Sequence, residues 1–156
     1  MVFTMTVVVI PIKPVFAYRI FTRKKRFDLR KQRHSAPPVE TGDRVVLYVS
    51  GNVKAFMGEY FVGEVLTGTP DYIIRALSRR PDSGVGEQDF AYIKGATYAF
   101  AMEVLNPIVY KTPVEMKVVL RIIPDYHPPL GVQKLDDRNP VVVLLFNKAR
   151  EITLRN

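Results

Sequence analysis

One short stretch of alternating polar and apolar residues decides the fold class of this chain: Lys25-Arg26-Phe27-Asp28-Leu29-Arg30. Successive side chains of a β-strand point to opposite faces, so Phe27 and Leu29 share one face and the charged residues share the other. The stretch therefore predicts a half-buried strand over residues 26–31. Neighbours on one face lie about 7 Å apart. That spacing allows Asp28 to form ion pairs with the arginines on either side of it.

Most of the chain before residue 106 also favours strands. Residues 2–12 are rich in Val and Ile and predict a buried first strand, which Pro11 and Pro14 end. Pro14 also fits the first turn of a short helix over residues 15–21. Further predicted strands occupy residues 44–50, 58–67 and 97–105, and Gly63 marks a bulge or a close backbone approach. Short helices are predicted for residues 71–77, with Asp71 as the N-cap, and for residues 87–93.

The last third of the chain is also interpreted as β-structure. Pro113 is expected to open one or two strands over residues 114–123. Residues 126–139 contain three of the chain's prolines or glycines and predict a long surface connection. The unbroken apolar run of residues 141–146 predicts a central strand. Together these segments indicate a mainly β (α+β) protein, built as a mixed, partly closed β-barrel with short crossover helices.

Size and composition favour one domain over residues 1–156, and hydrophobic residues make up 47% of the chain. The absence of cysteine excludes disulfides and thiolate chemistry and favours a reducing, cytoplasmic location. No apolar run reaches the roughly 18 residues that a membrane helix needs, and the N-terminus lacks the pattern of a signal peptide. We expect no membrane association.

Positive charge is concentrated in one segment. Residues 19–33 carry eight basic residues and one acid, which gives +7 out of a net charge of +8 for the whole chain. A local surplus of this size attracts polyanions such as nucleic acid. The alternative is an ordinary solvated strand end or a nuclear-type address.

Several kinds of catalytic site find little support. The two histidines, His34 and His127, stand far apart and have no partners at ligand spacing, so no metal site and no cofactor are expected. There is no nucleophile elbow of the hydrolase type. Gly84-Val85-Gly86 lacks the third glycine of a dinucleotide fingerprint and is interpreted as a loop.

The central stretch and its flanks resemble the ASCH domain of the PUA-like superfamily. That family opens on an Ile-Lys-Pro motif, here residues 12–14, and continues through a helix to a Gly-x-Lys-x-x-Glu-x-Arg segment. Lys25 and Arg30 match the lysine and the arginine, Asp28 replaces the glutamate, and Arg23 replaces the glycine. Residues 41–48 match the turn and strand that follow.

The resemblance covers roughly residues 5–120 and implies a PUA-like barrel. Residues 121–156 are then a C-terminal extension with an added strand, as expected for an uncharacterised archaeal branch. PUA-like domains commonly bind RNA, so the resemblance implies an RNA or nucleotide partner held in a basic cleft. The expected binding residues are Lys13, Lys24, Lys25, Arg26, Asp28, Arg30 and Tyr48, with Tyr60, Tyr92 and Tyr98 as further stacking candidates.

An enzyme is the alternative function. Some ASCH proteins resemble small amidohydrolases that act on acylated cytidine with a lysine, a threonine and a glutamate. Lys25 matches the lysine and is the candidate catalytic residue, whereas Asp28 occupies the threonine position. At the position of the family's glutamate, just before the small helix, this chain offers Asp82 or Ser83, with Glu87 slightly later. Because Asp28 opposes the neutral form of Lys25, we predict that Lys25 stays charged and binds anions.

Overall fold

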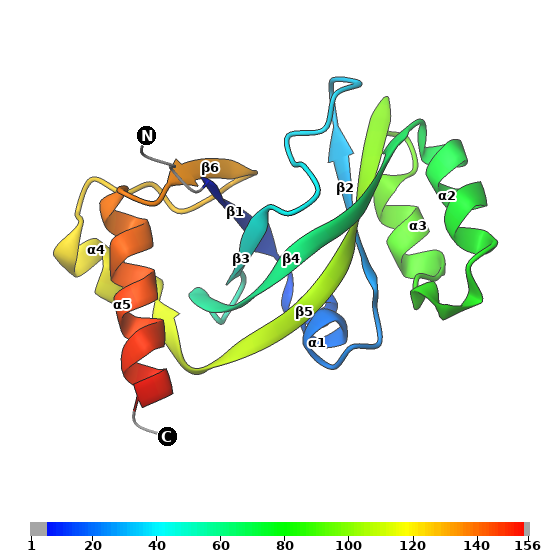
Figure 1. The fold of residues 1–156 in the computed structure, drawn as a ribbon. Coiled ribbons are helices and arrows are strands. Elements are labelled where there is room, and N and C mark those ends of the chain that lie inside the picture. Colours follow the sequence, from blue (N-terminus) through cyan, green and yellow to red (C-terminus); the bar gives the residue numbers. More distant parts are fainter. Residues whose placement is uncertain (1–5, 155–156) are drawn as a thin grey trace, which may run out of the picture. The chain divides into compact units, whose positions relative to one another are not determined.

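The structure is a computed structural model that describes the backbone of residues 6–154 and the side chains of residues 6–148 (Figure 1). Its chain divides into two compact units. Unit 1 comprises residues 1–18, 43–60 and 108–156, and unit 2 comprises residues 19–42 and 61–107. In chain order the elements are β1 (Thr6–Ile12), α1 (Pro14–Phe21), β2 (Phe27–Gln32), β3 (Arg44–Val49), β4 (Ala55–Gly68), α2 (Pro70–Ser78), the 3₁₀ helix η1 (Pro81–Ser83), α3 (Glu87–Ile93), β5 (Tyr98–Glu115), α4 (Met116–Ile122), β6 (Gln133–Asp136) and α5 (Pro140–Leu154).

The described strands form one mixed sheet in the order β2-β5-β4-β3-β1-β6. β1 runs parallel to β3, with Val7 opposite Arg44, and antiparallel to β6. β2 runs antiparallel to β5, with Phe27 opposite Glu103. The mixed α+β class is confirmed. The sheet has two edge strands, β2 and β6, so over the described residues it is not a closed barrel.

Unit 1 packs β1, β3 and the first half of β4 against α4 and α5. One cluster of its buried apolar residues comprises Val7, Val9, Val46, Tyr48, Phe56, Val114, Met116, Val119, Val141, Val142 and Leu145. The first predicted strand and the helix after Pro14 are confirmed for the described residues, and residues 2–5 of that strand lie outside them.

The predicted central strand over residues 141–146 is wrong, because this segment opens the helix α5. Asn139 supplies the start signal that propensity alone misses: its side-chain oxygen accepts from the Val141 amide at 2.9 Å, and Pro140 takes the first helical position. Val141, Val142 and Leu145 then bury one helical face, while Val143 is 44% exposed. An apolar run of this length fits a helix and a strand equally, and the cap decides between them.

Three smaller predictions also fail. β5 continues to Glu115, and the segment after it is the helix α4 rather than a strand. The predicted connection over residues 126–139 contains the edge strand β6. The N-cap of α2 is Thr69, whose hydroxyl accepts from the Tyr72 amide at 3.2 Å, and not Asp71.

Unit 2 packs β2 and parts of β4 and β5 against α2 and α3, which lie side by side in Figure 1. One hydrophobic cluster of this unit comprises Phe27, Leu29, Leu66, Ile73, Leu77, Ile93, Ala99 and Ala101. The predicted strand at residues 26–31 and the predicted helix at 87–93 are confirmed. The polar face of β2 is not open to solvent as expected, because Asp28 is only 2% exposed. Among the described helices, none combines the length and the apolar character needed to cross a membrane.

Candidate functional site

The turn after α1 places the central motif of the sequence. The Arg23 amide donates to the Ile20 carbonyl at 3.0 Å, and the Lys24 amide donates to the Arg19 carbonyl at 2.9 Å. This pair of bonds is the Schellman motif, which ends a helix with one residue in the left-handed conformation. That residue is Arg23, with φ of 63°. The chain is thereby redirected, and Lys25 enters the interior of unit 2.

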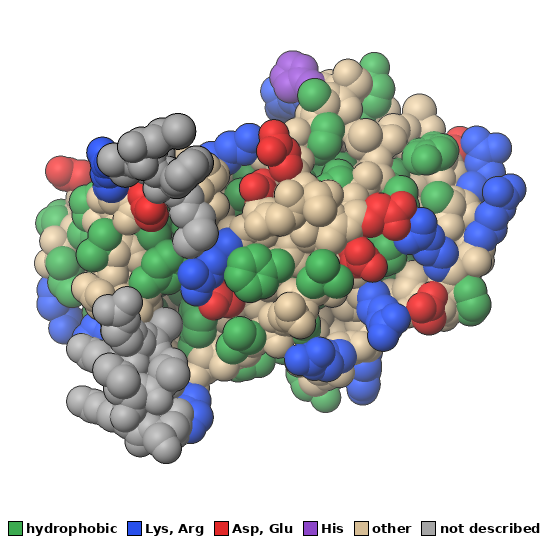
Figure 2. Space-filling view, viewed as in Figure 1, with side chains coloured by type: hydrophobic (Ala, Val, Ile, Leu, Met, Phe, Trp, Pro, Cys, Tyr) green, Lys and Arg blue, Asp and Glu red, His purple; other side chains and the backbone are tan. Residues whose placement is uncertain are grey.

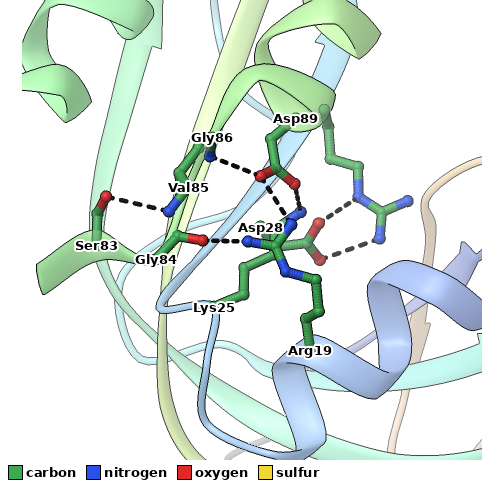
Figure 3. Close-up of polar contacts among 9 residues, drawn as sticks. Arg19, Lys25, Asp28, Ser83, Gly84, Val85, Gly86 and Asp89 are labelled. Atoms are coloured by element: carbon green, nitrogen blue, oxygen red, sulfur yellow. Dashed lines mark hydrogen bonds and ion pairs between the residues drawn. The ribbon is translucent and has the colours of Figure 1, made fainter.

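Lys25 is 3% exposed and forms an ion pair with a buried carboxylate of α3. Its Nζ donates to Asp89 Oδ1 at 2.5 Å. The Arg19 guanidinium donates to the other oxygen of Asp89 at 3.0 Å and also to the Gly84 carbonyl. Figure 3 shows the side chains of Lys25 and Arg19 converging on Asp89. Two cations from the end of α1 and the following turn therefore share one carboxylate.

The position of Asp89 in α3 explains why it remains a carboxylate. It lies in the first turn of the helix, and its Oδ2 accepts from the Gly86 amide at 2.9 Å. Burial by itself would raise the pKa of Asp89, but the hydrogen bonds from Lys25 and Gly86 outweigh that effect and leave its pKa lowered. The positive end of the helix dipole favours the same charged form.

The loop between η1 and α3 passes very close to the Lys24–Lys25 backbone. Gly84 has φ of 70°, and a Cβ at this position would lie 1.7 Å from the Lys24 carbonyl oxygen. The Arg26 amide donates to the Ser83 carbonyl at 2.8 Å. Only glycine fits here. The close approach of its backbone holds the N-terminal end of α3 against the segment that carries Lys25.

Asp28 and Arg30 form a second pair on β2, as their spacing predicts. The Arg30 Nε and Nη2 atoms donate to the two oxygens of Asp28, each at 3.0 Å. Arg26 does not join them. It lies on the surface and pairs with Asp82 at 3.2 Å. The predicted ion pairing around Asp28 is therefore correct for Arg30, whereas Arg26 pairs with Asp82 instead.

A pocket of about 290 Å³ lies in unit 2 next to Lys25. It is lined by basic, acidic, amide and apolar side chains: Arg23, Lys25, Arg26, Glu103, Val104, Leu105, Asn106 and Pro107. Arg23 and Asn106 are two of the three non-glycine residues with positive φ in the described chain, and both line this pocket. Unusual backbone conformations concentrate at functional sites, which supports treating the pocket as the candidate site.

The structure brings some of the predicted site residues together and separates others. Lys25 and Arg26 line the pocket, and Lys24 is an exposed neighbour in the same turn. Asp28 and Arg30 belong to unit 2 but are not among the lining residues.

Lys13 and Tyr48 belong to unit 1. Tyr48 is 6% exposed, and its ring centroid lies 5.3 Å from that of Phe56, so its ring is a core contact. A ring packed in this way cannot stack on a base, so the prediction that Tyr48 is a binding residue is wrong. Tyr60 is completely buried, and Tyr92 contacts Lys31, whose Nζ lies 4.8 Å from the ring centroid.

Surface charge is less uniform than the sequence count indicates. On the face drawn in Figure 2, basic and acidic side chains are interspersed. Within residues 19–33, at least four of the eight basic residues form ion pairs with acids: Arg19, Lys25, Arg26 and Arg30. The +7 of this segment is therefore partly neutralised by acids from outside it.

Asp89 and Gly84 are the site residues that sequence reasoning missed. The resemblance offers Asp82 and Glu87 as carboxylates for the acid position, but Asp82 pairs with Arg26 at the surface and Glu87 is exposed. The spacing of Gly86 and Asp89 gives a usable signal, because an acid three residues after an N-cap accepts from the cap amide. That signal identifies the carboxylate that points back toward the preceding loop.

Comparison with known proteins identifies the fold. No family model matches the chain, and no curated protein matches its sequence. Among solved structures, the ASCH protein of Zymomonas mobilis matches with a TM-score of 0.71 and 22% identity over 90% of this chain and 94% of its own. A variant of that protein gives a TM-score of 0.73 at 21% identity, also over 90% and 94% of the two chains. A hypothetical protein from Leishmania major gives 0.54 at 12% identity, over 94% of this chain and 97% of its own. The chain therefore has the ASCH fold that its motifs predict.

Proposed function

We propose that this chain, which has the ASCH fold, binds RNA or a nucleotide in the pocket beside Lys25. The observation that carries the proposal is the lining of that pocket. Three cationic residues and one carboxylate line it together with the apolar residues Val104, Leu105 and Pro107. Ligand pockets in proteins combine an apolar lining with a few placed polar groups in this way.

The groups around the pocket suit the two ends of a nucleotide. Arginine presents a fixed fork of donors that matches a phosphate. The carboxylate of Glu103 can accept from the edge of a base, and the amide of Asn106 can both accept from it and donate to it. Glu103 is held in place, since its Oε1 accepts from the Glu64 amide at 3.0 Å. The volume of about 290 Å³ is at the small end of ligand pockets and fits one nucleotide rather than several.

Salt dependence tests the proposal. Binding of a short single-stranded RNA of mixed sequence should weaken with salt, the log of the affinity falling by about 0.7 per phosphate contacted. Charge reversal of Lys24 and Arg26 together should flatten that slope. The matched control reverses Lys31 and Arg33, which carry the same charge and lie outside the pocket lining, whereas Arg26 lines the pocket and Lys24 lies between two lining residues in the chain. Equal losses in the two variants would mean general electrostatic attraction, and no binding at low salt would refute the proposal.

Hydrolysis of an acylated nucleoside by Lys25 is the second candidate, favoured by one observation. Lys25 lines the pocket and contacts a buried carboxylate, so a reactive lysine would have both access and a partner. Because its Nζ donates to Asp89, we assign Lys25 an electrostatic role and expect no turnover. Deacylation that disappears in Lys25→Ala and survives in Lys24→Ala would reverse this assignment, because a chemical role belongs to one lysine.

A further inference from the structure

The pocket contains an arginine at a backbone position where glycine is the stable choice. Arg23 is the left-handed residue of the Schellman motif that ends α1. An L-residue with a Cβ pays a steric penalty in this conformation, which glycine avoids. Asparagine and aspartate are tolerated better than arginine. The local structure therefore gives no reason for arginine at this position.

The other cations of the pocket already have acidic partners. Lys25 is paired with Asp89 and Arg26 with Asp82. Among the described residues, the Arg23 guanidinium makes no ion pair or hydrogen bond, although it lines the pocket. A guanidinium fork that no acid occupies, held at the edge of a pocket, is suited to an anion from outside the chain.

We propose that Arg23 is the phosphate-binding residue of this pocket and is retained there at the expense of stability. This inference rests on the proposed function and names the group that the pocket recognises: a phosphate monoester or diester attached to a nucleoside. The phosphate lies against the Arg23 fork. The base then lies toward Glu103 and Asn106, since these residues supply the only acidic and amide side chains of the described lining.

The inference predicts opposite effects of one substitution on two properties. Arg23→Gly removes the strained Cβ and should lower the equilibrium constant for unfolding about five-fold. The same change should reduce the affinity for a short single-stranded RNA about ten-fold and lower its salt slope by about 0.7, the loss of one phosphate contact.

Lys54 provides the matched control. It is a second basic residue in the left-handed conformation, with φ of 51°, and it is exposed in unit 1. Lys54→Gly should stabilise the protein by a similar factor and leave RNA affinity unchanged. Arg23→Lys keeps the charge and the strain, so it should leave stability unchanged and cause an intermediate loss of affinity.

The measurements are denaturant unfolding and RNA binding on the three variants, with adenosine and adenosine monophosphate as further probes. Stronger binding of the monophosphate than of adenosine, lost in Arg23→Gly, would assign the site to a free nucleotide. If the protein binds RNA but not adenosine monophosphate, and Arg23→Gly loses the RNA binding, the ligand of the site is a phosphodiester. The inference would be overturned if the Arg23→Gly variant binds RNA as tightly as the wild type, or if it is less stable than the wild type. Failure of the wild-type protein to bind any of these probes would instead refute the proposed function.

Discussion

Unit 1 and unit 2 each contain an ion pair whose buried acid also accepts from a second side chain, and these two pairs differ in what surrounds them. In unit 1, the Arg44 fork bonds both oxygens of Glu59, at 2.6 and 2.7 Å. The ring of Phe146 covers the guanidinium at 4.0 Å, and the Tyr110 hydroxyl donates to Glu59 at 3.3 Å. The carboxylate raises the pKa of Tyr110, whose burial acts in the same direction and more strongly.

The pair in unit 2 is built differently. Asp89 is shared between Lys25 and Arg19, and Lys25 lines a pocket. A buried ion pair is by itself weak evidence for function, because structural pairs perturb their surroundings in the same way. The neighbouring pocket, with its left-handed Arg23 and Asn106, is what distinguishes the pair in unit 2.

The largest difference between the two pairs should appear when each loses its acid. Asp89→Ala leaves Lys25, which is 3% exposed, without its carboxylate and should lower the free energy of unfolding by about 3–5 kcal/mol. The Arg44 side chain is 23% exposed and can reach water, so Glu59→Ala should cost only about 2 kcal/mol. Denaturant unfolding checks both values. Equal costs, or a greater cost at Glu59, would contradict the distinction.

The close backbone contact in unit 2 should give the next largest effect. Gly84→Ala combines a left-handed φ with a clash against the Lys24 carbonyl and should cost about 3 kcal/mol. Gly95→Ala is the control, because Gly95 has φ of 86° but no atom within 4 Å of its Cβ position. Gly95→Ala should cost only about 1 kcal/mol, because it has the penalty of the left-handed backbone without a steric clash. Similar costs for the two glycines would show that the loop moves away freely.

Low pH should destabilise unit 2 by protonating Asp89. The folded-state pKa of Asp89 is lowered from its usual 3.8, so its contribution to stability is present above that value and is lost as the pH falls through the folded-state pKa. We expect the free energy of unfolding to fall between about pH 5 and pH 2. The fall should be smaller in Asp89→Asn, which keeps an acceptor for the Gly86 amide. An unchanged acid profile in this variant would exclude Asp89 as a titrating group.

Removal of an exposed ion pair of unit 2 should cause the smallest loss of stability. Arg80 donates to both oxygens of Glu64, at 2.7 and 2.9 Å, but the two side chains are 38% and 43% exposed. Exposed pairs contribute little because water and salt screen them, so Arg80→Ala should cost about 0.5 kcal/mol. The loss should shrink further at high salt. A cost comparable to that of Asp89→Ala would mean that burial is not the deciding variable.

The sequence predicts those parts of the fold that depend on local patterns. The alternation of Phe27 and Leu29 identifies β2, and the i, i+2 spacing of Asp28 and Arg30 identifies their ion pair. The strand predicted for residues 141–146 is wrong because an apolar run fits either a helix or a strand, and only the cap at Asn139 distinguishes the two.

The candidate site depends on long-range contacts that no local pattern records. Lys25 and Asp89 are 64 residues apart, and their pairing follows from the turn at Arg23 and the close approach of Gly84. The motif predicts that Lys25 matters, but it does not name the acid that Lys25 meets. The left-handed conformation at Arg23 does agree with the glycine that the resemblance places at this position.

Nuclear magnetic resonance titration with a short single-stranded RNA tests the central claim most directly. If the pocket in unit 2 is the binding site, the largest backbone amide shifts should occur at Arg23, Arg26 and Asn106, and they should saturate with a single affinity. Arg33, which is basic and exposed but outside the pocket lining, should shift little. Shifts that are largest at Arg33, or that spread evenly over basic residues of both units, would show that RNA is held by general charge and would contradict the account.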